Sequence, residues 1–152
     1  MKIRRLGFHE DPPMDLLLLA DPSTEKIREY LHNGECYIAE ENEIFGVYVL
    51  LPKNRDTIEI MNVAVTKGMQ GKGYGKRLVL DAIEKAKNAG YNRVEIGTGN
   101  SSIYQLALYQ KCGFRITDID RDFFIRNYEM EIFENGIRCI DMIRLSIELV
   151  IN

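Results

Sequence analysis

A glycine-rich turn between an apolar segment and an amphipathic helix constrains this chain more than any other feature of its sequence. The segment Thr57 to Val65 has the composition of a strand, glycines follow at positions 71, 73 and 75, and helical periodicity begins at Tyr74. In that order, the backbone N–H groups of the turn and the positive end of the helix converge on one place. The segment therefore predicts a site for an anion, most often a phosphate.

The charges around the turn favour the same prediction. No acid lies between Ile60 and Leu80, and the cations there are Lys67, Lys72, Lys76 and Arg77. Two familiar phosphate sites do not fit, because no G-x-x-x-x-G-K-[ST] loop can be written here and the glycine spacing differs from G-x-G-x-x-G. The turn alone leaves two alternatives open, a purely structural turn and a solvated face for the lysines.

The rest of the chain predicts a mixed α/β fold in a single domain spanning residues 1–152, since no linker or repeat interrupts it. The expected strands are Lys2–Phe8, Glu35–Ala39, Ile44–Leu51, Thr57–Val65, Arg93–Gly97, Phe114–Ile119 and Arg138–Leu149. The expected helices are a short one after Asp11-Pro12-Pro13 and longer ones at Ser23–Asn33, Tyr74–Ala89 and Ser102–Lys111.

Two segments at the proper separation resemble motifs of the GNAT superfamily of N-acetyltransferases. Gln70-Gly71-Lys72-Gly73-Tyr74-Gly75 is similar to the acyl-CoA motif [RQ]-x-x-G-x-[GA]. Residues 102–114 resemble the second motif, N-x-x-A-x-x-L-Y-x-x-x-G-F, with Ser102 and Gln105 in place of its Asn and Ala. The resemblance covers Met1 to Ile119. It implies a GNAT-like mixed, mostly antiparallel central sheet flanked by helices, in the order β-α-α-β-β-β-α-β-α-β-β.

The resemblance also implies acetyl-CoA as the co-substrate, without a metal. In the family, the strand before the turn pairs with the pantetheine arm, and the N–H groups of the turn hold the pyrophosphate. The residues that take these places are Val63, Ala64, Val65, Gln70, Gly71, Lys72, Gly73, Tyr74, Gly75 and Lys76. In the second motif, Ser102 is expected to contact the co-substrate, and Asn100 is the alternative source of an amide contact.

Transfer of an acetyl group to an amine requires a neutral amine, and an alkylamine is neutral in only about one molecule in several thousand at pH 7. Glu59 is the predicted base, because the family often places a carboxylate at this position. Glu59 lies four residues before Val63, and the two side chains share one face of the strand only if no bulge intervenes. Tyr109 matches the family tyrosine that protonates the departing thiolate. A surface glutamate and a packed core tyrosine are the structural alternatives.

The segment Asp118 to Glu134 is acidic and suits a cationic amine, and its Phe123, Phe124 and Tyr128 suit the wall of a pocket; a solvated loop is the alternative. The predicted function is acetyl-CoA-dependent transfer of an acetyl group to a primary amine of a small molecule or protein, by direct attack in a ternary complex. A non-catalytic acyl-CoA-binding sensor or scaffold on the same fold is the main rival. A nucleotide-binding oxidoreductase is the third candidate.

Charge and composition disfavour several other classes. A net charge of −3 gives no general attraction to nucleic acid or to a membrane surface. No apolar run approaches the ~20 residues of a membrane span, and prolines interrupt any signal-peptide core. Cys36, Cys112 and Cys139 are odd in number and widely spaced, which disfavours disulfides and zinc. We therefore expect a cytoplasmic protein with reduced thiols; the sequence leaves open homodimerisation, which is common in the family.

Overall fold

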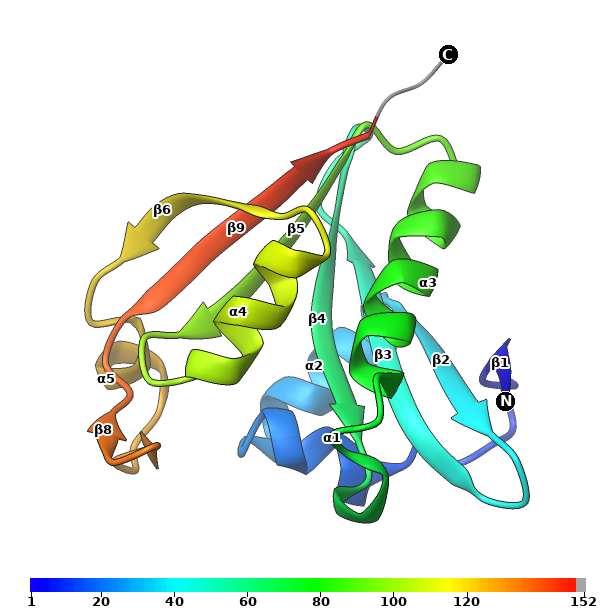
Figure 1. Cartoon of the computed structure of the whole chain (residues 1–152), viewed down its shortest axis with the longest axis horizontal. Helices are drawn as coiled ribbons and strands as arrows, with labels where there is room; N and C mark the ends of the chain where they lie inside the picture. Colours follow the sequence, from blue (N-terminus) through cyan, green and yellow to red (C-terminus); the bar gives the residue numbers. More distant parts are fainter. Residues whose placement is uncertain (150–152) are drawn as a thin grey trace.

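The computed structural model describes residues 1–149, which form a seven-stranded sheet with helices on both faces (Figure 1). The strand order is β1-β2-β3-β4-β5-β9-β6, and every neighbouring pair is antiparallel except β4 and β5. The strands are β1 (Lys2–Arg5), β2 (Glu35–Glu40), β3 (Ile44–Pro52), β4 (Thr57–Val65), β5 (Arg93–Gly99), β6 (Arg115–Asp120) and β9 (Met142–Glu148).

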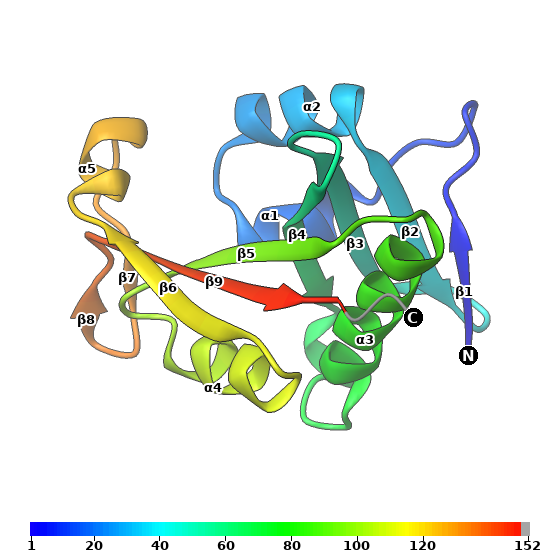
Figure 2. The same cartoon turned by 90° about the horizontal axis from the view of Figure 1, so that it is seen from above.

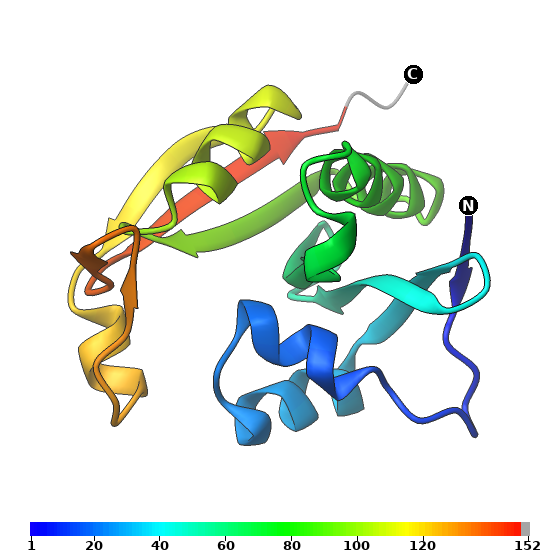
Figure 3. The ribbon, with the colours of Figure 1, turned by 60° about the horizontal axis from the view of Figure 1, so that its bottom comes forward.

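The helices lie in two layers, one on each face of the sheet (Figures 2 and 3). One layer is α1 (Met14–Ala20) and α2 (Thr24–Asn33), and the other is α3 (Tyr74–Asn88) and α4 (Ile103–Lys111). A short 3-10 turn, η1 (Lys67–Met69), precedes α3. After β6 come a short helix, α5 (Phe123–Asn127), and a separate hairpin of β7 (Phe133–Glu134) and β8 (Ile137–Arg138).

Alternation along the central strands divides the core in two. In β3, Val47 and Val49 pack toward α1 and α2, whereas Tyr48 and Leu50 pack toward α3. Successive side chains in a strand point to opposite faces. A strand buried on both faces therefore needs a continuous apolar run, which is what β3 has.

β4 contains a bulge that changes which of its residues share a face. Ile60 and Asn62 pair with consecutive residues of β3, so that Met61 is an extra residue. Val63 consequently lies on the α3 face together with Ile60, and Glu59 lies on the opposite face. The condition under which Glu59 and Val63 were expected to share a face is therefore not met.

β4 and β5 are paired over only part of their length. Residues Thr57–Ile60 pair with Arg93–Ile96, and the two strands then diverge (Figure 1). β5 instead remains paired with β9 as far as Gly99. The end of β4 consequently has one edge without a neighbouring strand. That edge faces the space that opens where β4 and β5 diverge, which we call the gap.

The first strand is shorter than expected because the chain folds back at Glu10. β1 ends at Arg5, rather than at Phe8. The Glu10 carboxylate accepts a hydrogen bond from the N–H of Gly7 at 2.7 Å and pairs with Arg4 at 2.6 Å. These contacts bend the segment away from β2.

The last strand begins at Met142 rather than at Arg138. The N–H groups of Ile140 and Asp141 donate to the side-chain oxygen of Asn100, at 2.7 Å and 3.0 Å, instead of to a neighbouring strand. The order of helices and strands agrees with the sequence prediction as far as β6, whereas α5 and the β7–β8 hairpin were not expected. Among the helices of residues 1–149, none has the length and apolar character needed to cross a membrane.

Candidate active site

The glycine turn forms an anion site at the start of α3. Gly71 and Gly73 have φ angles of 78° and 86°, which residues with a side chain adopt only at a cost. A Cβ at either position would meet no atom within 4 Å. Glycine therefore suits these positions because of its backbone conformation, and not because a side chain would clash. From Gly71 to Lys76, no backbone N–H donates to an acceptor within residues 1–149, and the first turn of α3 has no acid. These donors are available to a ligand.

A cleft of about 570 Å³ lies between this turn, the end of β4 and α4. Of the residues expected to contact the co-substrate, it is lined by Val63, Ala64, Val65, Gln70, Gly71, Gly73, Gly75 and Lys76. Lys72 and Tyr74 do not line it. Lys72 is exposed, and the Tyr74 ring packs edge-on against Phe45 with 4.9 Å between ring centroids.

The free edge of β4 directs backbone groups into this cleft. The N–H of Thr66 donates to the carbonyl of Phe45 at 2.8 Å, so alternate residues from Thr66 backward face β3. Val63 and Val65 therefore turn their N–H and C=O groups away from β3. The Gln70 side-chain amide donates to the carbonyl of Val65 at 2.9 Å, which ties the turn to the strand. An extended ligand can pair with this edge as an added strand.

Tyr109 lies where the cleft meets the gap between β4 and β5. It is only 5% exposed, and its ring packs edge-on against Phe114. Burial raises the pKa of Tyr109 well above its ordinary value, and the nearby Cys112 and Glu134 add to the effect. The phenol therefore keeps its proton at neutral pH and can donate it.

A small cavity of about 90 Å³ occupies the gap between β4 and β5, and we call it the junction cavity. Its lining includes Ile60, Met61, Asn62, Val63, Gly97, Thr98, Ser102, Gln105, Tyr109 and Glu134. It shares Val63, Gln105 and Tyr109 with the cleft. It shares Ile60, Met61 and Gly97 with a third cavity on the other face of the sheet. The junction cavity thus lies between the cleft on one face of the sheet and the third cavity on the other.

The third cavity, of about 410 Å³, lies between α2, the sheet and α5. We call it the aromatic cavity, because Tyr30, Phe123, Phe124 and Tyr128 line it. The expectation that the last three residues wall a pocket is confirmed. The charged residues of its lining balance one another: they are Lys26, Lys53 and Arg144 against Asp21, Glu29 and Glu59.

Glu59 lines the aromatic cavity and is 6% exposed. Nη1 of Arg144 lies 3.3 Å from each of its carboxylate oxygens, and Nζ of Lys53 lies 3.1 Å from Oε1. The two cations neutralise this carboxylate. Its role as the base stays a prediction.

Asp21 holds together the elements around the aromatic cavity. Its carboxylate accepts hydrogen bonds from the hydroxyls of Tyr128 at 2.9 Å and Tyr30 at 3.2 Å. The side-chain amide of Asn62 in turn donates to the Tyr30 hydroxyl oxygen at 2.9 Å. Burial raises the pKa of both tyrosines, so their hydroxyls remain donors at neutral pH. The network fixes α5 against the loop between α1 and α2.

Ser102 and Asn100, the two candidates for a polar contact with the co-substrate, occupy different places in the structure. Ser102 is buried and lines the junction cavity, where its hydroxyl donates to Oε1 of Glu134 at 3.0 Å. Asn100 lines neither the cleft nor the junction cavity, and its amide donates to the carbonyl of Arg138 at 3.1 Å. The structure therefore does not bring Asn100 to the site. The contact of Ser102 with the co-substrate stays a prediction.

The acids between residues 118 and 134 are mostly remote from these cavities. Glu134 lines the junction cavity, but Asp118, Asp120, Asp122, Glu129 and Glu131 line none of the three. Of the acids in this segment, the structure therefore brings only Glu134 to these three cavities, and attraction of an amine by the segment stays a prediction. Sequence reasoning missed the separate position of Glu134, although the Asn135-Gly136 that follows it is a strong hairpin signal.

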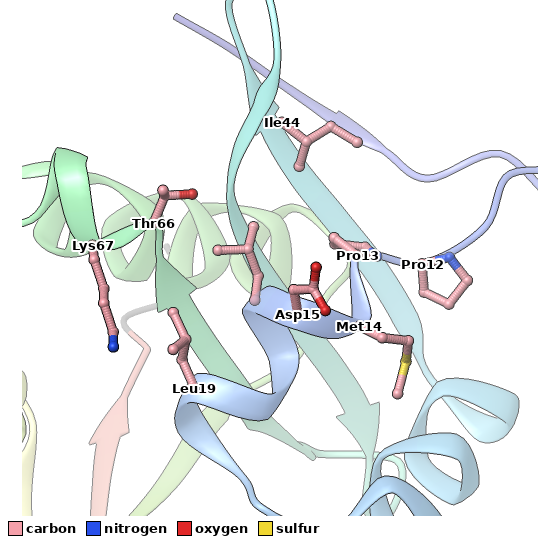
Figure 4. A pocket seen from close by; sticks show the side chains of 9 residues that line it. Pro12, Pro13, Met14, Asp15, Leu19, Ile44, Thr66 and Lys67 are labelled. Atoms are coloured by element: carbon pink, nitrogen blue, oxygen red, sulfur yellow. The ribbon is translucent and has the colours of Figure 1, made fainter.

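Another cavity, of about 670 Å³, lies beside α1 and is lined by Pro12, Pro13, Asp15 and Lys67 among others (Figure 4). It has only Leu19 in common with the junction cavity, so it lies outside the site described above. Within residues 1–149, no group of three or more His, Cys, Asp or Glu side chains is arranged to hold a metal ion.

Comparison with known proteins agrees with this geometry. The model of the acetyltransferase (GNAT) family matches residues 5–114. The chain is 61% identical over 140 residues to the N-acetyltransferase YvbK of Bacillus subtilis (strain 168), and the match covers 91% of this chain and 90% of that protein.

Solved structures extend the match to the whole fold. A GNAT family acetyltransferase from Elizabethkingia anophelis with acetyl-CoA bound superposes with a TM-score of 0.96 at 54% identity, covering 97% of each chain. A Bacillus subtilis acetyltransferase in complex with CoA gives a TM-score of 0.93 at 58% identity, covering 98% of this chain and 99% of the other. The predicted fold class is confirmed, and the chain belongs to the GNAT family of N-acetyltransferases.

Proposed function

We propose that this protein transfers the acetyl group of acetyl-CoA to a primary amine of a small molecule. The observation that carries the proposal is one cleft lined by three features: unpaired N–H groups of the glycine turn, the free edge of β4, and Tyr109. Relatives more than half identical to this chain contain acetyl-CoA or CoA, which supports the identity of the donor.

The cleft suits each part of the donor. The N–H groups from Gly71 to Lys76 would hold the pyrophosphate, since they converge at the positive end of α3. The backbone groups of Val63 and the N–H of Val65 would pair with the amide groups of the pantetheine arm, while the Val65 carbonyl is held by Gln70. This alignment leads the thioester toward Tyr109 and the junction cavity.

The acceptor would approach from the aromatic cavity. Its volume of about 410 Å³ is within the range of small-molecule sites. Because its charged residues balance, we expect the aromatic walls and the shape of the cavity, rather than net charge, to select the acceptor.

Direct attack in a ternary complex is supported by the proposed places of donor and acceptor, on opposite sides of the junction cavity. Attack by the neutral amine on the thioester carbon forms the C–N bond, and collapse of the tetrahedral intermediate breaks the C–S bond. Tyr109 would protonate the departing sulfur, because its buried phenol is still protonated at neutral pH.

A turnover screen tests the proposal. The protein is mixed with acetyl-CoA and, in turn, with polyamines, aminoglycosides, amino acids and peptides, and free CoA thiol is measured while mass spectrometry detects the acetylated amine. We expect at least one amine to raise thiol release above the background without amine. Tight calorimetric binding of CoA with no amine-dependent release would contradict the proposal and favour a sensor. Stronger binding of NAD than of CoA would favour an oxidoreductase.

A further inference from the structure

We infer that Glu134 is the catalytic base of this acetyl transfer and that it acts from the junction cavity. The inference rests on the proposed function, because it names the residue that takes the proton of the amine in that reaction. Glu134 and Tyr109 line the same cavity, which shares lining residues with both larger cavities. An amine that comes from the aromatic cavity and reacts beside Tyr109 would therefore lie close to the Glu134 carboxylate.

Local structure fixes the position of Glu134. It precedes the turn of the β7–β8 hairpin, where Asn135 and Gly136 have φ angles of 54° and 74°. The side-chain amide of Asn135 donates to the carbonyl of Ser101 at 2.8 Å, which anchors the hairpin to the loop before α4. The Ser102 hydroxyl donates to Oε1 of Glu134 at 3.0 Å. Oε2 has no hydrogen-bond partner within residues 1–149, which leaves it for the amine or for a bridging water.

The surrounding charges distinguish Glu134 from Glu59. Glu59 is already paired with Lys53 and Arg144, whereas within the described part of the chain no ion pair involves Glu134. Two adjacent cations cancel the attraction of a carboxylate for an ammonium group. A carboxylate without a cation attracts the ammonium group and is free to accept its proton.

The other groups around Glu134 are uncharged at neutral pH. The titratable ones are Tyr109 on α4 and Cys139 after β8; burial raises the pKa of both, and the Glu134 charge raises them further. The remaining polar neighbours in the cavity include Thr98 and Asn62. The buried Oδ1 of Asn62 has no hydrogen-bond partner within residues 1–149.

The proton transfers balance with these residues alone. Glu134 removes one proton from the ammonium group, directly or through one water, and the neutral amine attacks the thioester carbon. As the C–S bond breaks, Tyr109 gives its proton to sulfur, and the second proton of the nitrogen passes to the Tyr109 phenolate. Glu134 then releases its proton to solvent. The products are the amide, CoA thiol and one proton.

The test compares two small acceptors, ethylamine and 2,2,2-trifluoroethylamine, at high concentration with saturating acetyl-CoA. Ethylamine is almost entirely protonated at pH 7, whereas the fluorinated amine is mostly neutral and needs no base. For Glu134→Gln we expect kcat/KM with ethylamine to fall by about 10²- to 10⁴-fold. The loss with trifluoroethylamine should be less than about tenfold. With ethylamine the rate of the variant should rise about tenfold per pH unit, because the variant must use the small neutral fraction of the amine, and its affinity for CoA should be unchanged by calorimetry.

Two further variants provide the comparison. Glu131→Gln makes the same charge change at an exposed residue shortly before Glu134, and should match the wild type with both amines. For Glu59→Gln, which lines the cavity proposed for the acceptor, only the ratio of the two amines is compared, and we expect the wild-type ratio.

The possible results are distinct. An equal loss by Glu134→Gln with both amines would overturn the inference, as would the selective loss of ethylamine turnover in Glu59→Gln instead. Failure of the wild type on every amine of the turnover screen would overturn the proposed function itself. Wild-type turnover with an unimpaired Glu134→Gln variant would overturn only the role of Glu134.

Discussion

Tyr109 shows how the surroundings of one side chain determine its chemistry. Its ring packs in the core between α4 and the sheet. The residue also lines both the cleft and the junction cavity. A phenol with an ordinary pKa of about 10 is already protonated at neutral pH, and burial raises the pKa of Tyr109 further, so the hydroxyl carries a proton that it can donate. The packed core tyrosine and the catalytic acid, which were alternatives from the sequence, are therefore compatible descriptions of the same residue.

For Tyr109→Phe we expect kcat to fall by about 100-fold or more, because the thiolate leaves without a proton donor. The Kd for CoA should change by less than about threefold, since the ring and its packing remain. Steady-state kinetics and calorimetry measure the two quantities. Tyr91→Phe, which removes a hydroxyl at a residue that lines neither the cleft nor the other two cavities, is the control. Turnover by Tyr109→Phe at the wild-type rate would remove Tyr109 from the acid role.

The residues that the sequence predicted well are those set by local motifs. The glycine turn and Tyr109 follow from short patterns, and they line one cleft. The face of Glu59 depends on a bulge in the pairing of β4 with β3, which no local pattern signals. The position of Glu134 depends on where the β7–β8 hairpin docks, through Asn135 and Ser101, which lie far apart in the sequence.

At the scale of elements, the turn between β4 and α3 is defined by its backbone conformation. Gly71 and Gly73 are left-handed and have open space at the Cβ position, whereas Gly68, just before them, has the same open space without a positive φ. These three glycines therefore separate the effect of conformation from the effect of volume.

We expect Gly71→Ala and Gly73→Ala each to cost about 1–2 kcal/mol, because a Cβ disfavours left-handed backbone. If the turn relaxes instead of bearing this cost, its N–H groups lose their alignment, and CoA affinity should fall by about tenfold. Calorimetric titration with CoA and urea unfolding measure both effects. Gly68→Ala should be within about 0.5 kcal/mol of the wild type. Equal effects at all three positions would contradict the conformational argument.

At the scale of the whole molecule, buried tyrosines and a partly buried thiol make the free energy of unfolding depend on pH in the alkaline range. Burial, with a smaller contribution from Glu35, raises the pKa of Tyr37 to about 12, and burial raises the pKa of Cys36 to about 12. Burial also raises the pKa of Tyr48, which donates a hydrogen bond to Asp81 at 2.7 Å. In the unfolded chain these groups lose their protons at lower pH than in the folded one.

The free energy of unfolding should therefore fall as pH rises from about 9 to about 12, because the unfolded state binds fewer protons than the folded state there. Below the ordinary pKa of these groups the contribution is fully present. Tyr37→Phe should remove about 2 kcal/mol of this alkaline loss, and Tyr104→Phe, at an exposed position, should remove none. Urea unfolding at several pH values measures the slopes. Identical slopes for Tyr37→Phe and the wild type would contradict the linkage.

The overall fold was more predictable than the site. Apolar runs and glycine stops identified the sheet and its covering helices, because strands buried on both faces and amphipathic helices have distinct periodicities. The segment after β6 was not predictable in the same way. Its helix α5 is short, and it is held in place by the contact between Tyr128 and Asp21, which are 107 residues apart.

The central claim is that donor and acceptor meet in one gap of the sheet, so that the amine attacks the thioester directly. The most direct test is a matrix of initial velocities in which acetyl-CoA and the best amine of the screen are varied together. The account predicts double-reciprocal lines that intersect, because both substrates must be bound before CoA leaves. Parallel lines, with CoA released before the amine binds, would indicate an acetylated enzyme and contradict the account.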